Sequence, residues 1–524
     1  MLLNQLKKAI LAFCLFAVFC ASAGSLNTFT LPDRALCEGF YYPDIQDSFP
    51  AVDFTTLDRL YIPAQHYKFM RIGNLPLRST SRPLIITNIG GQVRVGGCGH
   101  HFNFVIGGGS NWILTGQYSA FNETGNINFK GHQNGFYANS AGTYGILIDA
   151  DFGAAKIGLA VGTRATDYEI SFIESRNLEF AGMMFKTDSD GTAHMDNVKI
   201  HDNYVHDTIS EGVYLGSTQS QPQHKFHNLQ FYNNRIIRTG TEMSQFGQLA
   251  NNSRIHHNVF LLGALDWKNP FQQFQDSGMQ FLHREGSMEF DHNIIIGAAS
   301  NNMIIFNPEL AGDIHNAGDI VDIHDNYFSY SRRTGIYIHS QSDPIKKIFF
   351  HDNYFSKVIF SYDELSPSST PRPIIFSDNS VNPIELSNNI FDNQVGQDFY
   401  SGGANITATN NTSQNIAEIA FHDLGWTGVG DYFTMEIWTA IDINSQPVQF
   451  FSGDLVLHNS LIYKAVNDID YTTAATDSPD VAGAAIWQPQ PAMHDDVRQH
   501  ISSPFVDIGL LDIVNDLIFL NNFE

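Results

Sequence analysis

Two glutamates in the middle of the chain have the residue type and spacing needed for acid–base chemistry. They open two copies of a repeated phrase, Glu211-Gly-Val-Tyr-Leu-Gly216 and Glu242-Met-Ser-Gln-Phe-Gly247. Hydrolysis of a glycosidic bond uses two carboxyl groups, one protonated as the acid and one ionised as the base or nucleophile. Two carboxylates held close together also raise the pKa of one of them. The sequence therefore predicts Glu211 and Glu242 as the catalytic residues of a glycoside hydrolase.

Further copies of this phrase supply the predicted surroundings of the pair. They read Ala181-Gly-Met-Met-Phe-Lys186, Ser277-Gly-Met-Gln-Phe-Leu282 and Thr334-Gly-Ile-Tyr-Ile-His339. The third and fifth positions are mostly apolar, which is typical of a strand with one face in a core, so the fourth position should line the outer face. The predicted substrate-binding residues are Lys186, Asp188, Tyr214, Gln245, Asp276, Gln280, His283, Arg284 and Trp267.

Other interpretations of the same residues remain open. Glu211 and Glu242 could instead be polar turn residues that cap backbone donors, or could hold Ca²⁺, which prefers clustered carboxylates. A polysaccharide lyase would need a base beside a uronate and a cation or Arg to stabilise the resulting anion. Lys186, Tyr214, His283 and Arg284 could serve in that reaction, although the sequence carries no recognisable lyase signature.

A second repeat indicates the elements that must position these residues. Alternating apolar and polar residues precede an Asn in phrases such as Val198-Lys-Ile-His-Asp-Asn203 and Val321-Asp-Ile-His-Asp-Asn326. The repeated Asn positions are 203, 234, 258, 293, 326, 353, 389 and 411, at intervals of 22 to 36 residues. Such intervals are typical of one turn of a solenoid, and the alternation is typical of strands. Asn tolerates the left-handed turn conformation, and stacked copies can hydrogen-bond through their amides. The histidines that precede these turns (His201, His256, His324 and His351) are interpreted as structural.

These phrases resemble those of secreted bacterial right-handed parallel β-helix proteins of the pectate-lyase-like superfamily. The resemblance covers about residues 50–415, and we place the solenoid domain at 24–415. It implies an all-β fold of three short parallel sheets around a dry core, and many members of the superfamily cleave polysaccharides. It does not name the reaction, because function belongs to sites rather than folds.

After residue 415 the Asn phrase stops and tryptophan becomes more frequent. The segment Phe451-Ser-Gly-Asp-Leu-Val-Leu-His-Asn-Ser-Leu-Ile-Tyr463-Lys-Ala465, followed by Ala485-Ile-Trp487, resembles the chitin-binding type 3 module of carbohydrate-binding families 5 and 12. The resemblance implies a linker at 416–436, a module at 437–490 and a tail at 491–524, with Tyr463, Trp487 and Trp438 as the sugar-binding aromatics. The alternative is a small β-rich domain in which these aromatics form the core.

The N-terminal residues predict export. Lys7 and Lys8 precede an apolar stretch that ends in small residues, which is typical of a signal peptide over residues 1–23. The export compartment is oxidising, so Cys37 and Cys98 either pair or remain as two buried thiols.

Composition limits the partners. The formal net charge of −25, from 54 acidic and 29 basic residues, disfavours nucleic acid and anionic membranes. No phosphate-binding loop or Cys/His metal spacing is recognisable, so no cofactor is firmly implied and no metal site is predicted beyond the Ca²⁺ alternative. We expect a secreted, monomeric protein that acts on a polysaccharide as a hydrolase, as a lyase, or as a non-catalytic adhesin.

Overall fold

The computed structural model describes residues 26–79, 82–100, 102–116, 144–150, 157–216, 224–270, 275–307, 316, 318–341, 347–358, 372–376, 383–392, 399–401, 405–417, 433–459, 461–469, 477–491 and 509. The predicted signal segment lies outside these residues, as do most of 416–436 and most of 491–524. No helix in the described part of the chain is long and apolar enough to cross a membrane.

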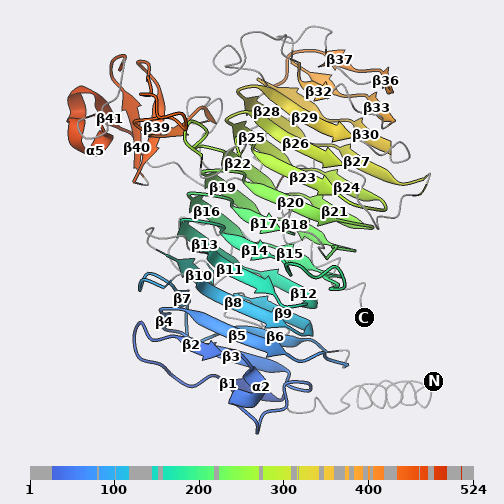
Figure 1. The fold of residues 1–524 in the computed structure, drawn as a ribbon, viewed down its shortest axis with the longest axis vertical. Coiled ribbons are helices and arrows are strands. Elements are labelled where there is room, and N and C mark those ends of the chain that lie inside the picture. The colour runs from blue at the N-terminus through green and yellow to red at the C-terminus, as the bar shows by residue number, and fades with distance from the viewer. Residues whose placement is uncertain are drawn as a thin grey trace, which may run out of the picture.

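Three parallel sheets wind around a common axis and run the length of the molecule (Figure 1). Sheet A consists of β1 (Thr28–Thr30), β3 (Arg59–Pro63), β6 (Leu84–Ile89), β9 (Ser110–Thr115), β12 (Thr166–Ser171), β15 (Lys199–His201), β18 (Gln230–Tyr232), β21 (Ser253–His256), β24 (Met288–Asp291), β27 (Ile320–His324), β30 (Lys347–His351), β33 (Ile384–Ser387) and β36 (Ile406–Thr409). Sheet B consists of β2 (Phe40–Tyr42), β5 (Met70–Leu75), β8 (Phe102–Gly108), β11 (Ile157–Gly162), β14 (Met183–Phe185), β17 (Val213–Leu215), β20 (Ser244–Leu249), β23 (Met279–His283), β26 (Asn301–Asn307), β29 (Thr334–Gln341), β32 (Ile374–Phe376) and β35 (Tyr400–Ser401). Sheet C consists of β4 (His66–Tyr67), β7 (Val93–Val95), β10 (Ile146–Asp149), β13 (Ile173–Leu178), β16 (Tyr204–Thr208), β19 (Arg235–Thr239), β22 (Val259–Gly263), β25 (Ile294–Ala298), β28 (Tyr327–Ser331), β31 (Tyr354–Ser356), β34 (Ile390–Phe391) and β37 (Thr412–Ser413).

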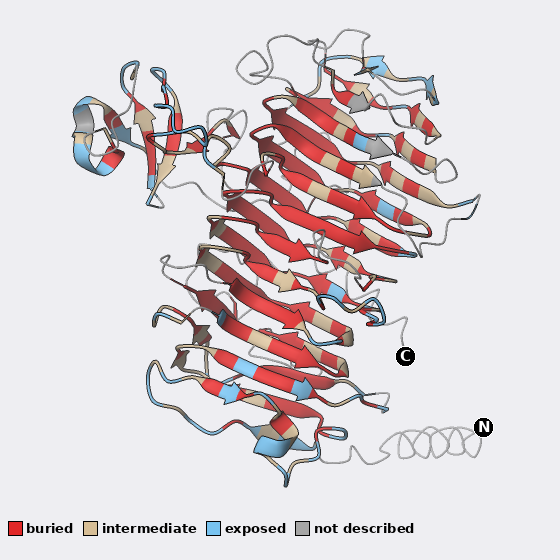
Figure 2. Cartoon of the chain, viewed as in Figure 1, coloured by how far each residue is buried: buried red, intermediate tan, exposed pale blue. Residues whose placement is uncertain are grey.

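This arrangement is the predicted right-handed parallel β-helix. Each turn of the chain, called a coil here, adds one strand to each sheet, and every pairing between coils is parallel. The apolar residues of each strand alternate toward the interior, as in β27, where Val321 and Ile323 are buried and their neighbours are half-exposed. The interior is one continuous apolar core from Leu31 to Phe399 (Figure 2). A short helix, α2 (Ile45–Ser48), lies near the N-terminal end.

The repeated asparagines form a ladder at the turn between sheets A and C. Asn293 shows the pattern. Its Oδ1 accepts hydrogen bonds from the backbone N and from Nδ2 of Asn258, both at 3.0 Å. Its Nδ2 donates to Oδ1 of Asn326 at 3.0 Å and to the carbonyl oxygen of Ile255 at 2.9 Å. The same bonds join Asn203, Asn234, Asn258, Asn293, Asn326, Asn353, Asn389 and Asn411.

The left-handed turn conformation belongs to the residue before each ladder asparagine, and not to the asparagine itself. These residues, with φ between 52° and 57°, are Asp202, Asn233, His257, His292, Asp325, Asp352, Asn388 and Asn410. Asp, Asn and His are the types that adopt this conformation most readily after glycine. The repeat therefore carries two separate constraints, a left-handed residue for the turn and an amide for the ladder.

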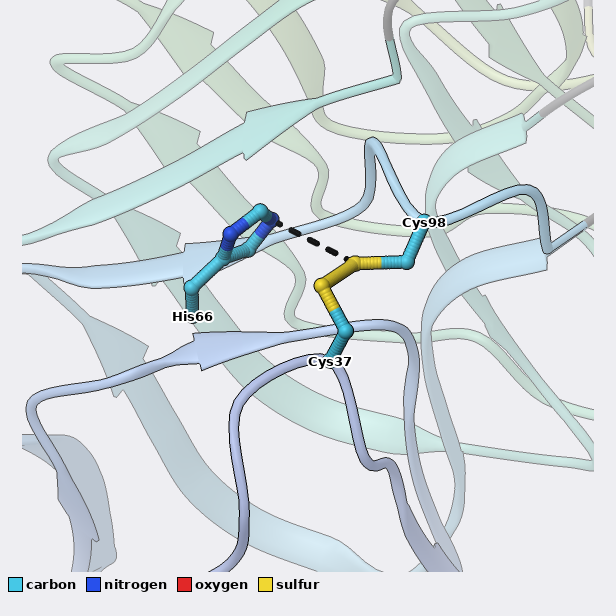
Figure 3. Close-up of side chains that lie close together, drawn as sticks. All are labelled: Cys37, His66 and Cys98. Atoms are coloured by element: carbon cyan, nitrogen blue, oxygen red, sulfur yellow. Dashed lines mark hydrogen bonds between the residues drawn. A yellow bond between two sulfur atoms is a disulfide. The ribbon is translucent and has the colours of Figure 1, made fainter.

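A disulfide joins two N-terminal coils. Cys37 and Cys98 are bonded, and Sγ of Cys98 lies 3.8 Å from Nε2 of His66 (Figure 3). Of the two alternatives left open by the sequence, the structure contains the pair.

A fourth, smaller sheet follows the solenoid. It consists of β38 (Glu436–Ile437), β39 (Leu455–His458), β40 (Leu461–Ala465) and β41 (Trp487–Pro489), with α5 (Pro479–Ala482) and the 3₁₀ turn η2 (Gly483–Ala485) before β41. We call it the C-terminal sheet. It packs on the outer face of sheet C (Figure 1), where Phe433, Met435, Leu455 and Ile462 join a cluster that includes Leu261 and Tyr330. Residues 433–436, predicted as linker, are thus packed against the solenoid, because Phe433 and Met435 are buried there.

Polar groups also connect the C-terminal sheet to the solenoid. The backbone N of Ile437 donates to the carbonyl oxygen of Leu265 at 2.8 Å, and Nζ of Lys268 lies 2.8 Å from Oε1 of Glu436. Asp266 lies near the same junction, where burial and then the charge of Glu436 raise its pKa to about 8. The junction therefore combines apolar packing with a carboxyl group that is costly to ionise.

Asn293→Ala should destabilise the solenoid strongly. It removes the acceptor of the backbone N of Asn258 and a donor to the carbonyl oxygen of Ile255 in a buried site, and each group left unsatisfied costs about 1–3 kcal/mol. The matched variant Asn411→Ala, at the half-exposed end of the ladder, should cost about 1 kcal/mol. Thermal denaturation followed by circular dichroism compares the two variants. An equal loss in both would contradict the buried ladder as the source of stability.

Asp266→Asn should stabilise the protein increasingly as the pH rises from about 4 to about 8. The folded pKa of about 8 exceeds the unfolded value of about 3.9, so the folded state binds more protons between these values. The free energy of unfolding of the native chain therefore falls as the pH rises through this window. We expect the melting temperature of the variant to exceed that of the native chain at pH 8.5 and to match it near pH 4. The exposed control Asp33→Asn should show no such dependence.

Candidate functional site

Glu211 and Glu242 come together at the start of neighbouring strands of sheet B. Glu211 precedes β17 and Glu242 precedes β20, and the backbone N of Gly212 donates to the carbonyl oxygen of Glu242 at 3.0 Å. In the paired strands Val213 lies beside Ser244, which places the two glutamates in the same slot of consecutive coils. The predicted proximity of the pair is thus present in the structure.

The glycine after Glu211 allows this close stacking. A Cβ atom at Gly212 would lie 2.4 Å from Cγ2 of Ile236 and 2.5 Å from the carbonyl oxygen of Met243. Gly182 and Gly278, in the same slot of the flanking coils, have similarly close neighbours. Glycine at this slot lets the strand start against sheet C, so the preceding side chain is held at a defined place.

The pair is buried rather than exposed. Glu211 is 3% exposed and Glu242 is 0% exposed. Glu211 accepts hydrogen bonds from Oγ of Ser210 at 2.5 Å and from Nε2 of Gln275 at 3.0 Å. Oε1 of Glu242 accepts from the amide of Gln280, while its Oε2 is buried without a hydrogen bond from any described residue. Both carboxyl groups of the predicted catalytic pair are therefore covered by protein and do not lie on an open surface.

The two carboxyl groups differ in their electrostatic surroundings. Burial, followed by the charge of Glu211, raises the pKa of Glu242 well above its usual range. A buried carboxyl with a like charge beside it and few donors stays protonated at neutral pH. Glu211 differs from Glu242 in its contacts, because it accepts hydrogen bonds from Ser210 and Gln275. Such an asymmetric pair is able to provide one acid and one base.

Other predicted residues surround the pair in sheet B. Tyr214, Gln245 and Gln280 are direct neighbours on β17, β20 and β23, as the alignment of the phrases predicts. Tyr214 and Gln245 are buried, and only Gln280 is partly exposed. Asp276 precedes β23, and burial raises the pKa of its carboxyl group.

A second group of predicted residues lies at the opposite end of the sheet B strands. Ser277 occupies the slot of Glu242 and His283 comes at the far end of β23, which is about 20 Å along an extended strand. His283 and Arg284 are buried, and Arg284 donates to Gln248. Lys186 and Asp188 also follow the end of their strand, β14, and form an ion pair at 3.1 Å. The structure therefore separates His283 and Arg284 from the glutamate pair.

Lys186 follows the far end of its strand but contacts a residue of the neighbouring strand in sheet B. Its Nζ lies 5.0 Å from the ring centroid of Tyr214, in the next coil. This cation–π contact turns the lysine back along the outer face of sheet B.

Trp267 lies at the junction with the C-terminal sheet. Nζ of Lys268 and the guanidinium of Arg332 lie 5.3 and 5.2 Å from its ring centroid. Nη2 of Arg332 also donates to the carbonyl oxygen of Thr434, at 2.9 Å. The environment of Trp267 is thus that of a packing residue between two parts of the chain.

The predicted sugar-binding aromatics of the C-terminal sheet are core residues. Trp487 is 1% exposed, its ring packs edge-on against Phe450 with centroids 5.4 Å apart, and its Nε1 donates to the carbonyl oxygen of Asp477. Tyr463 is buried in the same cluster, and Trp438 packs against it. Assignment of Tyr463 and Trp487 to sugar stacking is corrected, because stacking needs an exposed ring face.

Gln275 is the functional candidate that sequence reasoning missed. It comes from the connection between β22 and β23, and its amide contacts Glu211 across 64 residues of chain. No periodic signal marks it, because it belongs to neither repeated phrase. Side chains able to hold a metal ion lie elsewhere, mainly along the ends of the sheet A strands, and no such group among the described residues includes either glutamate.

Comparison with known proteins finds likeness in structure only. No protein-family model matches the sequence, and no curated protein sequence matches it. The A-module of the Azotobacter vinelandii mannuronan C-5 epimerase AlgE4 is 10% identical, with a TM-score of 0.42, and the match covers 73% of this chain and 94% of that one. The GH136 lacto-N-biosidase from Eubacterium ramulus is 10% identical (TM-score 0.40; 68% and 62% covered). An alginate lyase from Paenibacillus sp. str. FPU-7 is 11% identical (TM-score 0.35; 74% and 99% covered). At such identities the likeness concerns the fold, and no reaction is transferred from it.

Glu242→Gln should stabilise the protein as the pH rises. The folded-state pKa of Glu242 is raised, so the folded chain binds a proton that the unfolded chain releases above about pH 4.3. The free energy of unfolding of the native chain therefore falls as the pH rises above that value. At pH 8 we expect the variant to melt at a higher temperature than the native chain, which corresponds to a gain of about 1–2 kcal/mol in the free energy of unfolding. At pH 4 we expect the two melting temperatures to be equal. Glu385→Gln is the control. Its carboxylate is half-exposed and paired with Lys347, so no gain is expected at either pH.

Proposed function

We propose that the chain is a secreted glycoside hydrolase that acts on a polysaccharide, with Glu242 as the acid and Glu211 as the base or nucleophile. One observation carries this proposal. Two glutamates stack in the same slot of consecutive coils, and burial together with the neighbouring charge raises the pKa of one of them. An acid that keeps its proton at neutral pH beside a hydrogen-bonded carboxylate is what glycosidic cleavage requires.

The contacts around Glu211 suggest how a sugar would engage the pair. The amide of Gln275 donates to Oε1 of Glu211 at 3.0 Å, and the amide of Gln280 donates to Oε1 of Glu242. A sugar hydroxyl is a donor of similar geometry and would take the place of the Gln275 amide. The Glu211 carboxylate would then act in one of two ways: as a base that activates a water molecule, or as the nucleophile that attacks the anomeric carbon itself. In either case Glu242 gives its proton to the leaving oxygen.

Two further features support action outside the cell on a polymer. The disulfide between Cys37 and Cys98 suits an oxidising compartment. The outer face of sheet B presents successive coils in register, with partly exposed Lys186 and Gln280 along it. A repeated surface of this kind matches a repeating ligand better than a small molecule.

The test measures product release from neutral and acidic polysaccharides by reducing ends and by ultraviolet absorbance together. We expect new reducing ends without new absorbance. Glu211→Gln and Glu242→Gln should each lower the rate about 10²–10⁴-fold, the usual contribution of a general acid or base. Glu385→Gln, on sheet A and paired with Lys347, should keep the native rate. A loss in Glu385→Gln equal to the loss in the pair would contradict the assignment.

The burial of the pair favours one alternative, a non-catalytic protein that binds polysaccharide. Both carboxyl groups are covered by protein side chains, as expected of polar residues with a structural role. In that case the chain binds a polysaccharide without releasing products, and the double variant binds it equally well. New ultraviolet absorbance would instead indicate a lyase. Of the residues proposed for a lyase, Tyr214, His283 and Arg284 are buried, and Lys186 is the accessible one.

A further inference from the structure

Sheet A carries a row of imidazole and carboxylate side chains that the glutamate chemistry does not use. His324 on β27 and His351 on β30 are direct neighbours in register, and their rings stack with centroids 4.8 Å apart and planes 7° apart. Asp322 lies two residues before His324 on the same strand, so both side chains point to the outer face. Ligand atoms of Asp322, His324 and His351 all lie within 4.8 Å of one another.

We propose that Asp322, His324 and His351 bind a divalent transition-metal ion of the Zn²⁺ type. Two imidazole nitrogens with one carboxylate oxygen suit Zn²⁺ and its first-row neighbours, whereas Ca²⁺ and Mg²⁺ prefer oxygen ligands alone. Oδ1 of Asp322 lies 3.0 Å from Nε2 of His351. This oxygen is buried, and its contact with His351 does not have hydrogen-bond geometry. A metal ion bound between Oδ1 of Asp322 and Nε2 of His351 would give each atom a partner.

A second observation supports the metal, namely how both imidazole rings are held. Nδ1 of His324 lies 2.9 Å from Oδ2 of Asp325, and Nδ1 of His351 lies 2.7 Å from Oδ2 of Asp352. A carboxylate on one ring nitrogen orients the ring and leaves the other nitrogen for a metal, as in most protein sites with histidine ligands. The two aspartates are the left-handed turn residues of their coils. In both coils the turn thus supplies the aspartate that contacts Nδ1 of the histidine ring.

Neighbouring combinations of residues fit a metal less well. Asp291, close to His292 and His324, is held by Arg254 through two hydrogen bonds of 2.8 and 2.7 Å, which occupies both of its oxygens. Asp325 is already the Nδ1 partner of His324. The group of Cys37, His66 and Cys98 contains the disulfide (Figure 3), so its sulfur atoms are not thiolate ligands. Elimination leaves Asp322, His324 and His351.

One of the three ligand pairs already has the required spacing, and the His324 ring has to tilt out of its parallel stack on His351 to complete the site. Metal bonds of about 2.0–2.2 Å bring ligand atoms to about 3–3.5 Å from one another, and the Asp322 to His351 distance already lies in this range. All three ligand residues lie on strands whose backbone is fixed by neighbouring coils. Their side chains are 28%, 17% and 21% exposed, so solvent can reach the ion and complete its coordination. The bound ion would cross-link two coils near the C-terminal end of the solenoid.

The proposal gives His324 and His351 a role in addition to the structural one expected from the sequence, and leaves that expectation unchanged for His201 and His256. An isolated His before a turn Asn gives no metal signature, because Asp322 and His324 share a strand while His351 belongs to the next coil. Stacking of the coils brings the three together.

The experiment measures ZnCl₂ binding to the whole purified chain by isothermal titration calorimetry after treatment with a chelator. We expect one strong site, a rise in melting temperature with Zn²⁺, and its reversal by chelator. His351→Ala and Asp322→Asn should each lower the affinity at least 10-fold. Asp325→Asn and Asp352→Asn, which remove the carboxylates that orient the two rings, should lower the affinity for Zn²⁺ about 10–100-fold. Absorption spectra of the Co²⁺ form should show imidazole coordination that His351→Ala removes.

His292→Ala is the matched control. This residue lies on the adjacent coil beside His324 and belongs to two of the discarded groups, so its removal tests the choice of ligands directly. The affinity of the His292→Ala variant for Zn²⁺ should stay within 2-fold of the native value. The proposal is overturned if native protein binds no more Zn²⁺ than His351→Ala does, or if His292→Ala loses as much affinity as His351→Ala. Melting curves without metal show whether each variant is folded.

Discussion

The hydrogen-bonded stacking of one coil on the next is the constraint on which the rest of the structure depends. Parallel strands pair in register through all three sheets, and the asparagine ladder repeats the same bonds at one turn of each coil. The ladder satisfies amides that are buried between coils, where an unpaired donor or acceptor is costly. Paired strands keep a defined register, apart from shifts in sheet B between β5 and β8, β20 and β23, and β26 and β29. Most strand residues therefore have a defined neighbour in the coils before and after them.

This stacking assembles polar sites from residues far apart in sequence. Glu211 meets Glu242 from the next coil, and His324 meets His351 in the same way. The energetic consequences of the two contacts differ. The glutamates are buried together, so one keeps its proton at neutral pH and the pair costs stability as the pH rises. The histidines are partly exposed and individually held by aspartates, an arrangement that leaves nitrogens for a ligand.

The C-terminal sheet shows how the needs of a small core limit function. A small sheet has little apolar area to bury, so large aromatics contribute most to its stability. Trp487, Tyr463 and Phe450 meet in its interior, and Phe433 and Met435 extend the packing onto sheet C. The aromatic residues that suggested sugar stacking thus hold this sheet together, while Phe433 and Met435 attach it to the solenoid.

The sequence alone determined the architecture, because alternation with a period of two and a recurrent turn asparagine already specify a strand, a buried face and a coil repeat. It also placed Glu211 beside Glu242, since equal positions of consecutive repeats become neighbours. The tertiary structure decided what covers each face. Gln275 reaches Glu211 from a connection of irregular length, His283 and Arg284 lie at the far end of their strand, and Trp487 turns inward. A repeat pattern defines which face a side chain is on, but the irregular connections between strands determine whether that face is open or buried.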